Sequence, residues 1–96
     1  MLDKNDLRKL RGLGNSLGSM VQIGKSGISD NLVSLLQTEL EAHELVKITI
    51  LKTADVDAKD TAERLASLTG SQVVQVIGRT ILLYRKSKEN RLEIRS

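Results

Sequence analysis

The apolar residues of the chain recur with two different periods, one typical of helices and one typical of strands. Apolar side chains spaced three or four residues apart predict three helices, at residues 3–13, 30–42 and 58–69. Runs rich in valine and isoleucine predict four strands, at residues 20–23, 45–51, 72–77 and 80–85. The resulting order is α-β-α-β-α-β-β. We therefore expect an α/β domain with two layers, in which helices pack on a small four-stranded mixed sheet.

Capping and turn residues mark the ends of these elements. Each predicted helix follows a residue that can cap it: Asp3 or Asn5, then Ser29, then Asp57. Gly70 stands where a left-handed residue ends a helix, and Gly78-Arg79 fits a two-residue type II′ hairpin. The glycine-rich stretch 12–19 is predicted to lie outside the first helix, and a polar tail at about 87–96 to be mobile or extended. Residues 1–96 should form a single domain.

The composition argues against several classes of function. The chain has no cysteine and one histidine, His43, so we expect no disulfide, no metal site and no cofactor. No Ser/His/Asp, Cys/His or paired-carboxylate arrangement is recognisable, so we expect no catalytic residues and no enzymatic activity. The sequence has no stretch that resembles a signal peptide or a membrane span, which predicts a cytoplasmic protein without a membrane partner.

Charge is distributed unevenly along the chain. Residues 1–27 carry five basic and two acidic side chains, and residues 71–96 carry six basic and two acidic ones. Residues 28–46 carry four acidic side chains and no lysine or arginine. Basic ends around an acidic middle favour a polyanionic partner.

The segment Gly24-Lys25-Ser26-Gly27 joins a predicted strand to a predicted helix and has three possible interpretations. It could be a nucleotide phosphate loop, a clamp for nucleic-acid backbone or an ordinary tight turn. The Walker A pattern needs a glycine at position 19, where the chain has Ser19. A backbone clamp fits better, because glycines let a phosphodiester approach the main chain and the helix start adds N–H donors. Asp30, in the first turn of that helix, opposes this interpretation because it repels phosphate.

Three blocks of the sequence, in a fixed order, resemble the YhbY-like family, the single-domain bacterial form of the CRM domain. They are LRGLGNSLGSMVQIGKSGISDNLVSLL, HELVKI and TGSQVVQVIGRTILLYR, within about residues 7 to 85. The resemblance implies a fold similar to the C-terminal domain of bacterial translation initiation factor three. It also implies RNA binding through a Gly-x-x-Gly loop, with ribosomal RNA or pre-50S particles as partners in assembly of the large subunit. The chain departs from the family at Gly14-Asn15 and at Leu17-Gly18-Ser19, where Ala-His and Leu-Lys-Pro are usual.

Basic residues outside the loop are expected to assist it. The complete set of expected RNA-binding residues is Gly24, Lys25, Ser26, Gly27, Lys4, Arg8, Arg11, Arg79 and Arg85. Tyr84 is the one aromatic residue of the chain, so we expect contacts to the RNA backbone rather than stacked bases. The alternative is a protein-interaction module with incidental basicity. Its surface would be an apolar patch on the open sheet face, made of Val73, Ile77, Leu82 and Tyr84.

Overall fold

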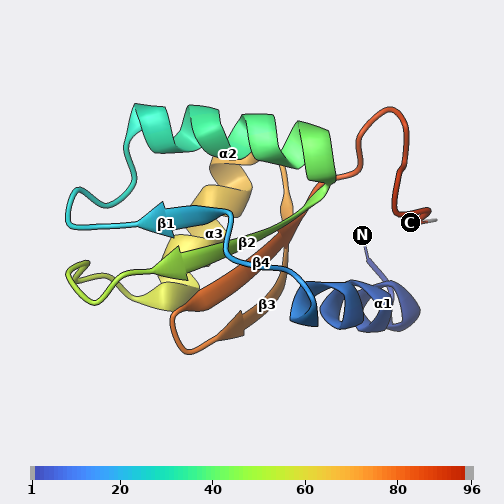
Figure 1. Ribbon diagram of the computed structural model, residues 1–96, viewed down its shortest axis with the longest axis horizontal. Coiled ribbons are helices and arrows are strands. Elements are labelled where there is room, and N and C mark those ends of the chain that lie inside the picture. The colour runs from blue at the N-terminus through green and yellow to red at the C-terminus, as the bar shows by residue number, and fades with distance from the viewer. Residues whose placement is uncertain (1, 95–96) are drawn as a thin grey trace.

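A four-stranded mixed sheet with the strand order β1-β2-β4-β3 forms the centre of the computed structural model, which describes residues 2–94 (Figure 1). The strands are β1 (Val21–Ile23), β2 (Leu45–Ile50), β3 (Gln72–Ile77) and β4 (Thr80–Tyr84). β1 pairs parallel with β2, and β4 pairs antiparallel with both β2 and β3. The helices are α1 (Lys4–Asn15), α2 (Asp30–His43) and α3 (Ala58–Thr69). The predicted α/β class, element order and mixed four-stranded sheet are confirmed.

α2 and α3 cover one face of the sheet, as the two predicted layers require (Figure 1). Twelve buried residues form the core between these layers: Val21, Ile23, Leu36, Leu40, Val46, Ile48, Ile50, Ala54, Ala62, Leu65, Ile81 and Leu83. The predicted caps hold both helices at their ends. Ser29 Oγ accepts a hydrogen bond from the N–H of Leu32, and Asp57 does the same for Asp60. Gly70 ends α3 with a φ of +67°.

α1 packs on one end of the opposite face, which we call the second face, and so adds partial cover outside the two layers. Its Leu10 is fully buried against Leu82 and Tyr84. Gly14 approaches the sheet so closely that a Cβ placed on it would lie 2.4 Å from Leu82 Cδ1. The predicted end of this helix at residue 13 is therefore too early, and the prediction that residues 12–19 lie outside it is wrong for residues 12–15. Gly14 extends α1 to residue 15 because the missing Cβ allows close packing.

A β-bulge in β3 changes which side chains reach the second face. The pairing with β4 shifts between Val73 and Gln75, so Val73 packs with the α2/α3 core while Val74 joins the cluster under α1. The predicted apolar patch is wrong, because the bulge turns Val73 to the other face and α1 and Ile94 bury Leu82 and Tyr84. Among its four members only Ile77 is exposed, at 63%.

The segment after β4 is packed against the domain through the side chain of Glu44. This carboxylate is fully buried and accepts hydrogen bonds from the N–H and the hydroxyl of Ser87 and from the N–H of Leu92, at 2.9 Å for both N–H groups. Ile94, at 1% exposure, completes the cluster under α1. The prediction of a mobile or extended tail is wrong for residues 87–94, and its last two positions lie outside the described residues.

Burial acts to raise the pKa of the Glu44 carboxyl. The hydrogen bonds from the Ser87 hydroxyl and from the backbone of Ser87, Leu92 and Arg91 together outweigh that effect. The pKa of Glu44 is therefore lowered below its ordinary value, and the buried group remains charged near neutral pH.

Candidate nucleic-acid interface

Three loops meet at the end of the sheet where β1 and β2 finish, on the left in Figure 1. The N–H of Leu51 donates to the carbonyl of Ile23 at 2.8 Å, which joins the loop after β1 to the loop after β2. The N–H of Ile50 donates to the carbonyl of Arg79 at 2.7 Å, and Arg79 Nη1 donates to the carbonyl of Leu51 at 3.1 Å. Residues 24–27 therefore lie beside residue 51, and residue 51 beside the tip of the β3–β4 hairpin.

Residues 24–27, here called the glycine loop, form a tight turn. The N–H of Gly27 donates to the carbonyl of Gly24 at 2.9 Å, and Gly27 has a φ of +68°. Lys25 and Ser26 lie at the tip of the turn. Both are exposed, and neither side chain makes a hydrogen bond or ion pair with a residue in the described range 2–94. The turn thus presents a cation and a hydroxyl to solvent just before α2.

The backbone conformation explains one of the two glycines of the loop but not the other. Gly27 needs its positive φ, which side chains rarely adopt. Gly24 has no positive φ, and a Cβ placed there would meet only Leu51 Cδ1, at an ordinary 3.8 Å. Packing and backbone conformation therefore do not require a glycine at position 24. A ligand that approaches the main chain closely would require one.

The start of α2 adds both an attraction and a repulsion for anions. Its first N–H groups have no partners within the helix, and the helix dipole is positive at this end. Asp30 is exposed in this first turn, as the sequence analysis expected, and its carboxylate opposes an anion there. The glycine loop is therefore favourable for phosphate at its tip, where Lys25 stands, rather than at Asp30.

The basic side of α1 forms a separate surface. Lys4, Arg8, Arg11 and Asn15 line a shallow depression of about 620 Å³ on this helix. α1 lies toward the other end of the molecule from the glycine loop (Figure 1). Arg11 also lines a second depression with residues of β3, so the C-terminal part of α1 comes nearest to the sheet end that bears the loop.

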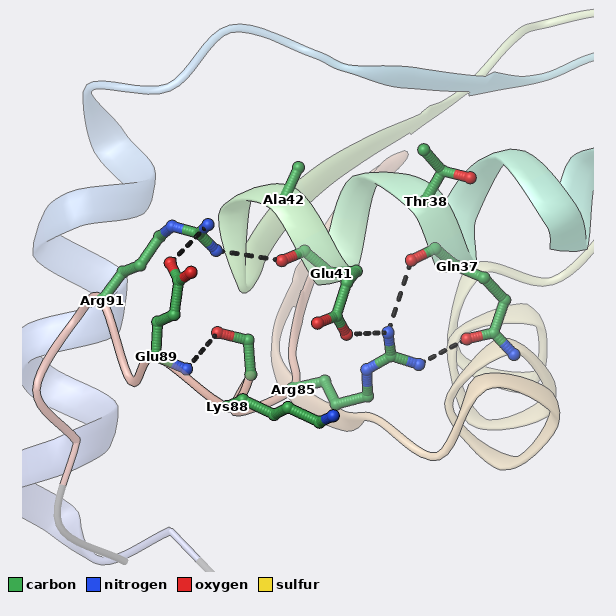
Figure 2. A pocket seen from close by; sticks show the side chains of 9 residues that line it. Gln37, Thr38, Glu41, Ala42, Arg85, Lys88, Glu89 and Arg91 are labelled. Atoms are coloured by element: carbon green, nitrogen blue, oxygen red, sulfur yellow. Dashed lines mark hydrogen bonds and ion pairs between the residues drawn. The ribbon is translucent and has the colours of Figure 1, made fainter.

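Arg85 lies at the opposite end of β4 from Arg79. Figure 2 shows its guanidinium turned toward α2, where it donates to the side chain and carbonyl of Gln37 and forms an ion pair of 3.3 Å with Glu41. It also donates to the carbonyl of Thr69 at 3.0 Å. The structure therefore does not bring Arg85 to the glycine loop. The distance between Arg79 and Arg85 could have been predicted from the sequence, because six residues of strand separate the two arginines by about 20 Å.

No group of three or more histidine, cysteine, aspartate or glutamate residues in the described chain could hold a metal ion. His43 lies at the C-terminal end of α2, 3.5 Å from the carboxylate of Glu39 one turn earlier. Among residues 2–94, no helix has the length and apolar character that crossing a membrane requires.

Comparison with known proteins shows to which family the chain belongs. The family model of the CRS1 / YhbY (CRM) domain matches residues 2–85. The chain belongs to this family. The protein named Probable RNA-binding protein YqeI, from Bacillus subtilis, is 42% identical over 91 residues, which are 95% of each chain. A protein of Haemophilus influenzae named RNA-binding protein is 29% identical over 86 residues, or 88% of this chain and 86% of that one.

The fold of this CRM domain is also found in a solved structure. The solution structure of a hypothetical Staphylococcus aureus protein, described as a candidate RNA-binding protein, matches it with a TM-score of 0.81 and 42% identity. The match covers 99% of this chain and 98% of the other. The resemblance inferred from the three sequence blocks is thus confirmed for both family and fold.

Proposed function

We propose that this CRM domain binds RNA and that the glycine loop contacts the phosphate backbone. The observation that carries the proposal is Gly24, which neither packing nor φ requires, beside an exposed Lys25 and Ser26. The names of its relatives, which describe RNA-binding proteins, support the same partner. The proposed role is binding rather than catalysis.

In the proposed interface, Lys25 supplies a mobile cation, Ser26 a hydroxyl donor, and Gly24 and Gly27 a main chain that phosphate can approach. Arg79 lies on the neighbouring hairpin and extends the basic surface. The depression on α1 with Lys4, Arg8 and Arg11 would hold a second stretch of backbone. Arg85 is left out of this interface, because its guanidinium is engaged at the far end of the sheet.

Salt titration of two matched charge reversals tests the loop. Fluorescence anisotropy with a labelled RNA should show affinity that falls steeply with salt, as counterion release requires. Lys25→Asp should weaken binding and lower the slope of log K against log salt by about 0.7–1. Lys88→Asp changes the net charge equally at the far end of the molecule, so it corrects for long-range repulsion. Equal effects of the two reversals would contradict a contact at Lys25.

A second matched pair tests the arginines. Arg79→Ala should weaken RNA binding and leave the free energy of unfolding nearly unchanged, because Arg79 is exposed. Arg85→Ala should lower the free energy of unfolding by about 1–2 kcal/mol and leave RNA affinity intact, because it removes hydrogen bonds to α2 and to the end of α3. The reverse pattern would place the interface at the other end of β4.

We further propose that the RNA is ribosomal and that the domain acts on precursors of the large (pre-50S) subunit, in the cytoplasm. The family resemblance supports this finer assignment. Cross-linking in cells, with sequencing of the attached RNA and sedimentation of the protein, tests it. We expect cross-links in large-subunit ribosomal RNA and comigration with precursor particles. Cross-links spread over messenger and transfer RNAs would leave RNA binding in place and remove the ribosomal role.

A further inference from the structure

The half of the second face that α1 leaves uncovered carries a row of polar side chains next to the three loops. The strand register places one residue of each strand in a line across this face: Gln22, Thr49, Thr80 and the apolar Ile77. Lys47 and Gln75 stand behind it, paired with Leu82, which is where α1 makes its closest contact. Because adjacent strands lie about 4.8 Å apart, this line spans roughly 14 Å.

Four polar side chains of this surface make no hydrogen bond within residues 2–94. We call Gln22, Thr49, Gln75 and Thr80 the sheet row. Gln22 is exposed, the other three are half-buried, and none of the four side chains bonds to another residue among 2–94. Lys47 Nζ donates to the carbonyl of Leu17 at 2.9 Å and keeps further donor capacity. A cavity of about 190 Å³ between this surface and the last turn of α1 is lined in part by Asn15, Lys47, Gln75 and Thr80.

The charges around the sheet row favour a polyanion. The sheet row itself contains no carboxylate. Lys47 within the face and Arg11 on α1 lie next to it, and Arg79 stands at the tip of the β3–β4 hairpin beside Leu51. Glu63 lines the depression beyond β3 together with Lys59 and Arg11. Gln22 precedes Gly24 by two residues, or about 7 Å of strand, so a ligand held by the glycine loop can reach the row.

We infer that the sheet row reads the bases of a single-stranded RNA segment whose backbone is held by the glycine loop. The inference rests on the proposed function. Glutamine amides and threonine hydroxyls can both donate to and accept from base edges, which phosphate-binding lysines cannot do. Single-stranded RNA is the matching partner, because base pairing occupies the Watson–Crick edges of a duplex, whereas unpaired bases leave these edges free for hydrogen bonds. Ile77 provides an apolar contact where other sheet-based RNA binders use an aromatic ring.

Two double variants remove the polar groups with which the sheet row would bind base edges, while keeping the side-chain shape. Thr49→Val with Thr80→Val removes two hydroxyls and suits strand residues, and Gln22→Met with Gln75→Met removes two amides at constant length. Thr38→Val, at an exposed position of α2, is the matched control. The probes are fluorescein-labelled 12-nucleotide oligomers of adenosine, cytidine and uridine, each titrated at two salt concentrations.

The wild-type protein should bind one oligomer at least about fivefold more tightly than another. Each double variant should bring the oligomers to within about twofold of each other while keeping the wild-type salt slope, and Thr38→Val should change neither. Lys25→Asp should weaken all oligomers alike. Equal wild-type affinities, or a preference unchanged in both double variants, would overturn the inference while the loop proposal survives. No binding to any RNA would overturn both.

Discussion

Replacing Glu44 by alanine should detach residues 87–94 from the domain while the sheet stays folded. The substitution removes a charged acceptor from two buried N–H groups and one hydroxyl. Hydrogen bonds to charged groups contribute about 1.5–3 kcal/mol each, so the three together set an upper limit of about 4.5–9 kcal/mol. The segment can instead detach and let these donors bond to water, at the cost of exposing Ile94, about 1.5–3 kcal/mol. We therefore expect the free energy of unfolding to fall by about 2–4 kcal/mol.

A glycine at the same position provides a matched control. Glu44 has a φ of +67°, a left-handed value that is unfavourable for a side chain by roughly 1–2 kcal/mol. Glu44→Gly loses the same carboxylate as Glu44→Ala but relieves this conformation. The glycine variant should therefore be more stable than the alanine variant by about 1 kcal/mol.

Urea unfolding and native-state hydrogen exchange together measure the effect. The amides of Ser87 and Leu92 should lose protection in Glu44→Ala, while amides within β2 and β4 keep theirs. The sign of the pH dependence follows from the lowered pKa of Glu44. Its stabilisation is present above the ordinary value of 4.5 and is lost as pH falls through the lower folded value. Glu44→Gln should not show this loss.

The reasoning would be refuted by a Glu44→Ala protein within about 0.5 kcal/mol of wild type whose Ser87 and Leu92 amides remain protected. Such a result would mean that the apolar contacts of Ile94 alone hold the segment.

Two further predictions concern the glycine loop and the buried tyrosine. Gly27→Ala should destabilise the fold by about 1–2 kcal/mol because of its positive φ, whereas Gly24→Ala should leave the unfolding midpoint unchanged and still weaken RNA binding. A Gly24→Ala protein with full RNA affinity would argue against close approach of phosphate to that residue. Burial, with the negative charges of Glu44 and Asp6, raises the pKa of Tyr84 to about 12. Ultraviolet titration should follow this group without interference, since the chain has no other tyrosine and no tryptophan; the stability it contributes is present below its ordinary value of 10.0 and lost as pH rises toward 12.

The elements of the fold could be predicted because their signals are local. Ser29 and Asp57 act as caps within three residues, and Gly70 and Gly78 both have the positive φ that their turns need. Leu36, Leu40 and Leu65 occupy the buried side of their helices, as the spacing predicted.

The features that sequence reasoning missed depend on contacts between distant residues. From the sequence alone, Gly14 is expected to end a helix. Its place within α1 is explained only by the sheet, because the missing Cβ leaves room for Leu82. The bulge at Val74 depends on the pairing of β3 with β4. Glutamate is usually found at the surface. The burial of Glu44 depends on donors from residues more than forty positions later.

The candidate interface could likewise be predicted only where its residues are adjacent in the sequence. The glycine loop could be found because its two glycines and its flanking elements are adjacent in sequence. The sheet row could not be found in this way, because Gln22, Thr49 and Thr80 become neighbours only through the register of three strands. Its four polar residues have no unusual spacing along the chain.

The two outer strands of the sheet have a consequence for how copies of the domain meet. β1 has only three residues, and β3 carries an irregularity in its pairing between Val73 and Gln75. Short or kinked outer strands give a neighbouring chain few backbone groups in line, so they resist edge-to-edge growth and aggregation. Two such domains crowded together on one long RNA would thus touch through side chains and would not fuse their sheets.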